Sequence, residues 1–357
     1  MGRIIPFWQT LLVVVLALGV IAYSIFFSYG ESHMPLLMAA VIATIAGALN
    51  GWKWSYMEAG MISAISRSLQ ACLILLSVGI LIATWKAGGI IPSMIYYGLN
   101  ILNPSIFLFT ACILCMIVSL CLGSSYTTAG TIGVAMIGVS IGLGVDPAMT
   151  AGAVVAGSYF GDKMSPLSDT TNLAPAVAGS NLFEHIRHMV YTVTPSILIA
   201  LVAYIILGRN AAAENISVTE SDLLQAEILN EFVVSPLLLI PVLILIAIVI
   251  LKIPALLGIF IGIFVGIFCM AAVQGIPVVD WFSTMHYGFV SASEAELGAG
   301  YTVADLVGGG GFDSMLWAVS VVLCSMSFAG VLEATGMLGD IAEKILSFAK
   351  KHRLFIQ

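Results

Sequence analysis

The sequence predicts an all-helical protein that crosses a membrane many times. The chain has 357 residues, of which 60% are hydrophobic and only 9% are charged, whereas soluble domains carry about 25% charged residues. Apolar runs recur along the chain, and each is long enough to cross about 30 Å of hydrocarbon as a helix of about 17 to 25 residues. A transmembrane barrel would need period-two alternation of polarity, which these runs lack.

The apolar runs define most of the spans directly. The first run is longer than the core of a signal peptide and no small-residue cleavage site follows it, so we interpret it as a span. An amphipathic stretch, 51–66, is expected at the membrane surface before the third span. The simple crossings that we expect are 7–28, 34–50, 68–86, 186–208, 235–251, 254–273 and 314–334.

Four further apolar runs are not simple crossings. Runs 104–121 and 124–143 are joined by GSSYTTAG, which is small, polar and too short for a loop in water. Runs 147–160 and 167–178 are each too short to cross alone. We therefore expect a re-entrant hairpin followed by a broken helix.

The basic residues predict the orientation. With the N-terminus in the cytoplasm, nine of the 12 Lys and Arg residues lie inside, two lie outside, and Lys163 lies within the membrane. This distribution follows the positive-inside rule. Residues 211–234 contain five acidic residues and no basic one, and we expect segment 209–234 to form an acidic external loop.

Two segments of the chain resemble each other. WSYMEAGMISA (54–64) and FSTMHYGFVSA (282–292) share five of eleven residues, and the span after each copy leads to a glycine turn, Gly88-Gly89 or Gly336. The second copy carries an extra loop of roughly 20 residues, and the two copies have opposite predicted orientations. Inverted repeats of this kind are typical of secondary transporters, which alternate access around a midplane site.

The repeat predicts the domain organisation. The first repeat covers 1–208, and the second, partial repeat covers 235–357 after the acidic loop. Because the second copy stops where its own hairpin and broken helix should begin, we expect it to be truncated and the chain to be about three quarters of a longer protein. Within the first repeat we expect scaffold spans in 7–103, the hairpin and broken helix in 104–178, and a closing span at 186–208.

The most polar stretch in the membrane region is GDKMSPLSDTTNLAP, residues 161–175. Each ionisable residue in it would cost about 2.5 to 3.5 kcal/mol at the bilayer centre, and such residues mark ion or proton paths. We expect Gly161 to end the first half-helix and Pro166, which lacks an N–H, to break the ladder. The break exposes carbonyl groups that suit a cation and N–H groups that suit an anion.

The residue types in this stretch favour a small hard cation, which prefers oxygen ligands. An aspartate that binds either Na⁺ or H⁺ makes the two ions compete, and this is the simplest antiport mechanism. We expect Asp162 and Asp169 to bind the transported Na⁺. The candidate site residues at the break are Asp162, Lys163, Ser165, Ser168, Asp169, Thr170, Thr171 and Asn172.

Ser124, Ser125 and Thr127 at the hairpin tip have matching chemistry and are expected to close the site from the other side. The alternative is that these hydroxyls bond back within a helix and allow close helix packing. For Lys163, the alternative to a substrate role is that it serves as a structural counter-ion for Asp162 or Asp169.

The segment GSYFGDKMSPLSDTTNLAPAVAGSNLFEHIRHMVYT (157–192) resembles the NhaC family of bacterial Na⁺/H⁺ antiporters, as does GSSYTTAGTIGVA (123–135). The resemblance covers most of the chain in span order. It implies a scaffold part, a moving transport part with elevator-type motion, and a homodimer in the bacterial inner membrane. Family motif positions fall on Asp162, Ser165, Ser168, Asp169, Thr170 and Asn172.

We therefore expect a Na⁺/H⁺ antiporter, not an enzyme, that exchanges cytoplasmic Na⁺, with Li⁺ as a second candidate, for external H⁺. The expected partners are the lipid bilayer and small ions, with no nucleic acid and no cofactor beyond the transported ions. The resembling family also includes exchangers that couple Na⁺ and H⁺ to malate and lactate, and for a carboxylate Lys163, Thr170 and Thr171 offer suitable groups.

Two other classes fit less well. An intramembrane aspartyl protease needs two aspartates on facing helices, whereas Asp162 and Asp169 share one segment, and Tyr159 breaks the Gly-x-Gly-Asp signature of that class. A passive channel would transport without coupling.

Overall fold

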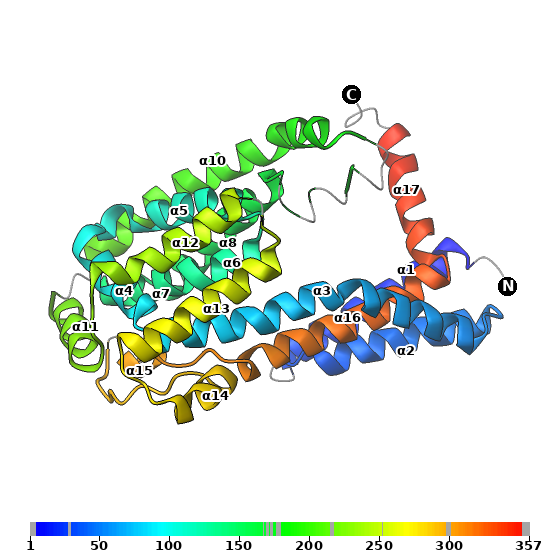
Figure 1. Ribbon diagram of the computed structural model, residues 1–357. Helices are drawn as coiled ribbons and strands as arrows, with labels where there is room; N and C mark the ends of the chain where they lie inside the picture. The colour runs from blue at the N-terminus through cyan, green and yellow to red at the C-terminus, as the bar shows by residue number, and fades with distance from the viewer. Residues whose placement is uncertain are drawn as a thin grey trace. The chain divides into compact units, whose positions relative to one another are not determined.

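The computed structural model describes residues 5–27, 30–166, 168, 171, 174–175, 180–214, 218–251, 253–297 and 301–351. This part of the chain is helical nearly throughout, and its extended pairing is limited to two isolated bridges, Phe289 with Gly309 and Glu296 with Thr302 (Figure 1). It contains five helices long and apolar enough to cross a membrane, or six if a bent pair counts as one span. The predicted all-helical, polytopic class is confirmed.

The chain divides into two compact units, and helix α3 (Trp54–Ala87) runs from one into the other. The first unit comprises residues 1–73 and 316–357, and the second comprises residues 74–315.

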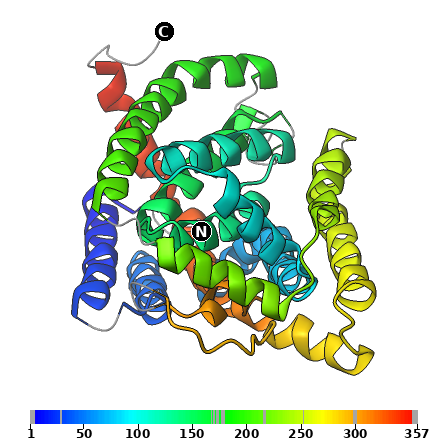
Figure 2. The ribbon, with the colours of Figure 1, turned by 90° about the vertical axis from the view of Figure 1, so that its left-hand side faces the viewer.

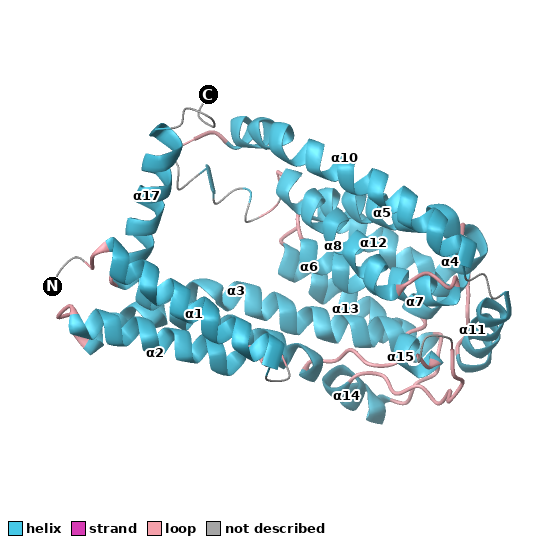
Figure 3. Ribbon diagram, turned by 180° about the vertical axis from the view of Figure 1, so that it is seen from behind, coloured by secondary structure: helices cyan, strands magenta, loops and turns pink. Residues whose placement is uncertain are grey.

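In the first unit, α1, α2 and α16 run side by side, and α17 leaves them at a steep angle (Figures 1 and 3). A Cβ added to Gly60 of α3 would lie 2.7 Å from the Gly330 carbonyl oxygen of α16, so small residues let these helices approach closely. Arg67 and Glu333 form an ion pair in which both side chains are about half exposed. The helices are α1 (Phe7–Phe27), α2 (His33–Leu49), α16 (Leu316–Ala334) and α17 (Met337–Lys351).

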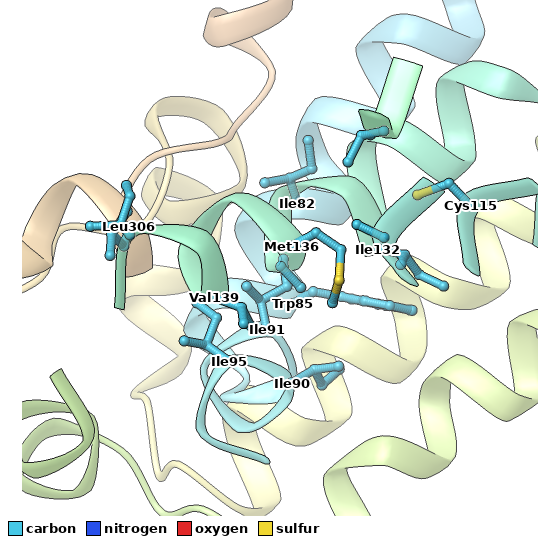
Figure 4. Close-up of a cluster of buried hydrophobic side chains, with 14 of the residues drawn as sticks. Ile82, Trp85, Ile90, Ile91, Ile95, Cys115, Ile132, Met136, Val139 and Leu306 are labelled. Atoms are coloured by element: carbon cyan, nitrogen blue, oxygen red, sulfur yellow. The ribbon is translucent and has the colours of Figure 1, made fainter. Parts of the chain in front are cut away.

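In the second unit, α5 and α8 make the most extensive helix pair, and α12 and α13 lie side by side (Figure 2). Figure 4 shows the core around Trp85, where side chains of α3, α4 and α7 meet. The longer helices are α4 (Ile90–Ile101), α5 (Phe107–Leu122), α7 (Val134–Gly142), α8 (Pro147–Met164), α10 (Leu182–Glu214), α11 (Val218–Glu231), α12 (Ile240–Ile250), α13 (Ala255–Ala272) and α14 (Val278–Tyr287). The shorter ones are α6 (Ser125–Thr128), a π-helical turn (Ala129–Gly133) and α15 (Val303–Val307), with 3₁₀ turns at Pro104–Ile106, Pro236–Leu239 and Asp313–Met315.

Several predicted boundaries are wrong in detail. The stretch 51–66 is continuous with the third span from Trp54 onward, because α3 runs unbroken for 34 residues, and its expected place at the membrane surface stays a prediction. At 1.5 Å per residue such a helix is about 51 Å long, so part of it extends beyond the hydrocarbon. The run 124–143 is divided into α6, the π-helical turn and α7, and the acidic segment 209–234 contains the helix α11.

Candidate functional site

The site is built at the C-terminal end of α8. This helix starts at Pro147, where the Asp146 side chain accepts hydrogen bonds from the next two free backbone N–H groups. It runs through Gly161 to Met164, so the prediction that Gly161 ends the half-helix is wrong. The residue that ends it is Pro166, because the preceding Ser165 takes the extended conformation (φ −79°, ψ 126°) that a following proline favours.

Gly161 has a packing role instead. A Cβ at this position would lie 2.5 Å from both the Leu120 nitrogen and the Met116 carbonyl oxygen of α5. Gly157, one turn earlier, meets the Cys112 carbonyl in the same way. The two glycines therefore bring the backbones of α5 and α8 together beside Asp162.

Asp162 is buried, with 7% of its surface exposed. The Ser125 hydroxyl donates a hydrogen bond to Asp162 Oδ2 over 3.2 Å. Ser125 is the first residue of α6, at the tip of the predicted hairpin. The structure thus brings together one residue from the tip and one from the break, and their role in transport stays a prediction.

The other tip residues bond locally. The Ser124 hydroxyl oxygen accepts from the Thr127 N–H at 3.3 Å and lies 3.0 Å from Thr127 Oγ1. Ser124 thereby caps α6, and the expected role of the tip in closing the site stays a prediction. The π-helical turn that follows α6 is a feature found frequently at functional sites.

Beyond Pro166, Ser168 and Thr171 lie at the end of α8. The Thr171 hydroxyl lies 3.1 Å from the carbonyl oxygens of both Asp162 and Lys163 and donates to them. The Thr171 N–H donates to Ser168 Oγ at 3.4 Å, and the Ser168 N–H donates to the Ser165 carbonyl at 3.2 Å. Ser165, Ser168 and Thr171 are almost fully buried, and the Thr171 hydroxyl adds to the Ser165 N–H, which also donates to the Asp162 carbonyl at the end of the helix.

The structure shows no ion pair between Lys163 and Asp162, which speaks against the alternative that Lys163 is a counter-ion for Asp162, and its role in binding stays a prediction. Its Nζ lies 5.3 Å from the centroid of the Tyr159 ring, a cation–π distance. Neighbouring residues on a helix point about 100° apart, which separates the two charged groups. Asp169, Thr170 and Asn172 lie outside the described residues, as does most of the predicted half-helix 167–178.

The described residues contain no group of three or more His, Cys, Asp or Glu side chains that could hold a metal ion. The Na⁺ ligand role predicted for Asp162 and Asp169 therefore stays a prediction, as does the absence of a cofactor. One buried charge was missed at the sequence level: Lys86, placed outside by the charge pattern, is only 6% exposed. Its partner is the Gly308 carbonyl, 222 residues further along the chain, and no local sequence pattern predicts such a contact.

Comparison with known proteins assigns the class of this membrane protein. Residues 157–356 match the model of the Na⁺/H⁺ antiporter family. The chain is 37% identical over 337 residues to the Na⁺/H⁺ antiporter NhaC of Alkalihalophilus pseudofirmus, covering 94% of this chain and 71% of that protein. It is 38% identical to an uncharacterized Na⁺/H⁺ antiporter of Haemophilus influenzae, covering 96% of this chain and 72% of that protein.

The name of a third relative includes organic acids as well as Na⁺ and H⁺. The chain is 34% identical to the malate-2H⁺/Na⁺-lactate antiporter of Bacillus subtilis, covering 96% of this chain and 72% of that protein. No solved structure matches the chain. The chain belongs to the Na⁺/H⁺ antiporter family, and it is accordingly a membrane transporter rather than an enzyme.

Proposed function

We propose that this chain exchanges Na⁺ for H⁺ at a site centred on Asp162. The observation that carries the proposal is the buried Asp162 carboxylate, contacted by the Ser125 hydroxyl between α6 and α8. A carboxylate and a hydroxyl at this depth supply oxygen ligands for a cation and an acceptor for a proton. Family membership supports Na⁺ and H⁺ as the two ions.

Competition for one carboxylate explains why the exchange is coupled. Na⁺ or H⁺ bound at Asp162 neutralises its charge, whereas the empty site carries a buried negative charge that is costly to move through a low-dielectric environment. The protein therefore changes its access only when one ion is bound. The Asp162 and Lys163 carbonyls, held by Thr171 in this state, become further cation ligands if that hydroxyl turns away.

The direction and the framework are part of the same proposal. The Lys and Arg distribution supports a cytoplasmic N-terminus in the bacterial inner membrane, with Na⁺ (or Li⁺) leaving the cytoplasm and H⁺ entering. The inverted repeat gains support from local structure: α3 leads through Gly89 (φ 75°) to α4, and α16 leads through Gly336 (φ 80°) to α17. Alternating access and a homodimer follow from the resemblance to the NhaC family.

The second candidate is Na⁺/H⁺-coupled exchange of carboxylates such as malate and lactate. The Bacillus subtilis relative, at 34% identity, favours it. In this case Lys163, beside Tyr159, is the natural partner for a substrate carboxylate.

The deciding experiment uses inverted vesicles with an imposed proton gradient that is followed by a pH-sensitive dye. Na⁺ is added alone, and then with lactate on one side of the membrane and malate on the other, in both arrangements. Collapse of the gradient by Na⁺ alone supports cation/proton antiport, and collapse only with carboxylates supports the second candidate.

Asp162→Asn should abolish the Na⁺ response while the protein still inserts. The matched control is Asp146→Asn, an exposed aspartate at the other end of α8 that keeps its capping oxygen after substitution. An unchanged response in Asp162→Asn would refute the site.

A further inference from the structure

Lys86 lies in the last turn of α3 and is buried. Its ammonium donates a hydrogen bond to the Gly308 carbonyl oxygen. Among the described residues no carboxylate forms an ion pair with it, although Asp305 lies near enough to act on it electrostatically. A buried ammonium is costly in a membrane protein and is rarely kept without a role.

The partner of Lys86 belongs to residues 308–311, which we call the glycine strap. Gly309, Gly310 and Gly311 have φ angles of 84°, 81° and 90°, a region that glycine adopts without steric cost. The Gly311 N–H donates to the Gly79 carbonyl of α3 at 2.8 Å. A Cβ on Gly310 would lie 2.7 Å from the backbone nitrogen of Ala83, so the strap lies directly on the helix backbone.

The contacts of the strap follow one face of α3. Gly79, Ala83 and Lys86 are spaced by four and three residues, which places them on the same side of the helix. Leu306 of α15, just before the strap, joins the same hydrophobic core (Figure 4). Lys86 therefore fixes one end of a segment whose other end is bonded to Gly79.

The same two turns of α3 also contact the hairpin of the candidate site. A Cβ on Gly130, in the π-helical turn, would lie 2.5 Å from Val78 Cγ1 and 3.5 Å from Ile82 Cδ1. The π-helical turn directly follows α6, which carries Ser125. In a close-packed interior a shift of these turns of α3 has to be taken up by the π-helical turn.

We propose that Lys86 is a positioning residue for transport: it holds the glycine strap on α3, and the strapped helix sets the position of the hairpin tip that meets Asp162. The inference rests on the proposed function for its transport readout. Lys86 touches neither of the transported ions in this role.

The test compares Lys86→Met and Lys86→Arg with Arg67→Met, which removes an exposed basic residue from the same helix. Hydrogen exchange of the full protein, followed by mass spectrometry, reports on strap docking through the Gly311 amide. Exchange should be about tenfold faster in Lys86→Met, and wild-type-like in the other two variants, because only the first loses the anchor.

Transport is measured in vesicles with whichever substrate drives proton movement, Na⁺ alone or Na⁺ with carboxylates. The apparent KM for Na⁺ in Lys86→Met should rise between about tenfold and 100-fold, the range expected for a misplaced binding group. In Lys86→Arg the apparent KM for Na⁺ should return most of the way to the wild-type value. Arg67→Met should leave this KM within about twofold of the wild type, as expected for an exposed ion pair.

Unchanged exchange in Lys86→Met overturns the anchoring role, and faster exchange with unchanged KM overturns the positioning role. If Lys86→Met does not insert, Lys86→Gln, whose shorter side chain withdraws the donor from the Gly308 carbonyl, is judged by the same two criteria. A wild-type protein without substrate-driven proton movement would refute the proposed function, whereas the exchange comparison tests the strap separately.

Discussion

Two interruptions of the helical structure in the second unit each place a buried charge beside irregular backbone. The charge is negative at one interruption and positive at the other. After α8, a proline ends the helix and the hydroxyl of Thr171 covers its last carbonyls, beside the Asp162 carboxylate. After α15, glycines let the backbone lie directly on α3, beside the Lys86 ammonium. Irregular backbone at membrane depth is tolerated only where protein or a water-filled cavity satisfies it.

The difference shows that an interrupted helix is not by itself an ion site. In the proposed mechanism, the Ser125 hydroxyl oxygen and the carbonyl oxygens that Thr171 now holds become available to a cation at Asp162. Around Lys86, a carbonyl that could bind a cation already accepts from a fixed ammonium. The first interruption is therefore suited to exchange ions, and the second to hold structure in place.

The largest expected contrast is between the two charges. Asp162→Asn should lower Na⁺-dependent proton movement by more than about 100-fold, because it removes both the ligand and the proton acceptor. Lys86→Met should leave measurable maximal transport with a raised KM. Dye-quenching assays on both variants at matched expression check this, and equal losses in both would erase the contrast.

The next prediction concerns Gly161. If it serves close packing on α5, Gly161→Ala should destabilise the protein by about 1 to 3 kcal/mol through overpacking. Gly152→Ala on the same helix is the control, because its added Cβ meets only the Tyr204 hydroxyl at 3.7 Å. That variant should be neutral or more stable by roughly 0.5 to 1 kcal/mol. Thermal unfolding in detergent measures both, and a stabilised Gly161→Ala would contradict the packing role.

Alanine variants of Ser125 and Ser124 distinguish a residue that contacts the Asp162 carboxylate from one that caps α6. Ser125→Ala should raise the apparent KM for Na⁺ by about three- to tenfold, as for loss of one ordinary hydrogen bond. Ser124→Ala should cost about 1 kcal/mol of stability through the lost cap and leave KM nearly unchanged. Na⁺ titrations of vesicle transport, paired with melting curves, test the pair, and a reversal of the two phenotypes would move the site to Ser124.

The smallest expected effect is the pH response of α15, which leads into the glycine strap. Hydrogen bonds from the Thr302 backbone and side chain lower the pKa of the exposed Asp305 carboxyl. Its capping contribution is therefore fully present above the unfolded pKa of about 3.9 and is lost as the pH falls through the lowered folded value. Hydrogen exchange of residues 301–311, corrected for intrinsic rates, should accelerate below about pH 4 in the wild type but not in Asp305→Ala. Equal pH responses in the two proteins would show that the Asp305 carboxylate does not stabilise α15.

The sequence predicted the spans best where an apolar run ends at glycine, proline or a polar residue. The bounds of α1, α2, α13 and α16 fall within two residues of the prediction for this reason. The continuity of α3 was missed because its polar first half suggested a surface segment, and α4 was missed because 12 residues are too few to cross. Both decisions depended on length and polarity, which do not report tertiary packing.

The residues of the candidate site were predicted by type, and their role in transport stays a prediction. The sequence placed Ser125 and Asp162 among the candidates, and the structure joins them. Gly161 was misinterpreted because a glycine before a proline suggests a helix end, whereas its close approach to α5 depends on the fold. The burial of Lys86 depends in the same way on a carbonyl far along the chain.

The central claim is that Na⁺ and H⁺ compete for Asp162. Calorimetric titration of the purified full protein with Na⁺, in two buffers of different ionisation enthalpy, measures the protons released on binding. Release of about one proton per bound Na⁺ is expected when the site is protonated beforehand, because a carboxylate must lose its proton to bind a metal ion. Asp162→Asn should show neither binding nor release. Na⁺ binding without proton release in the wild type, or undiminished release in Asp162→Asn, would contradict it.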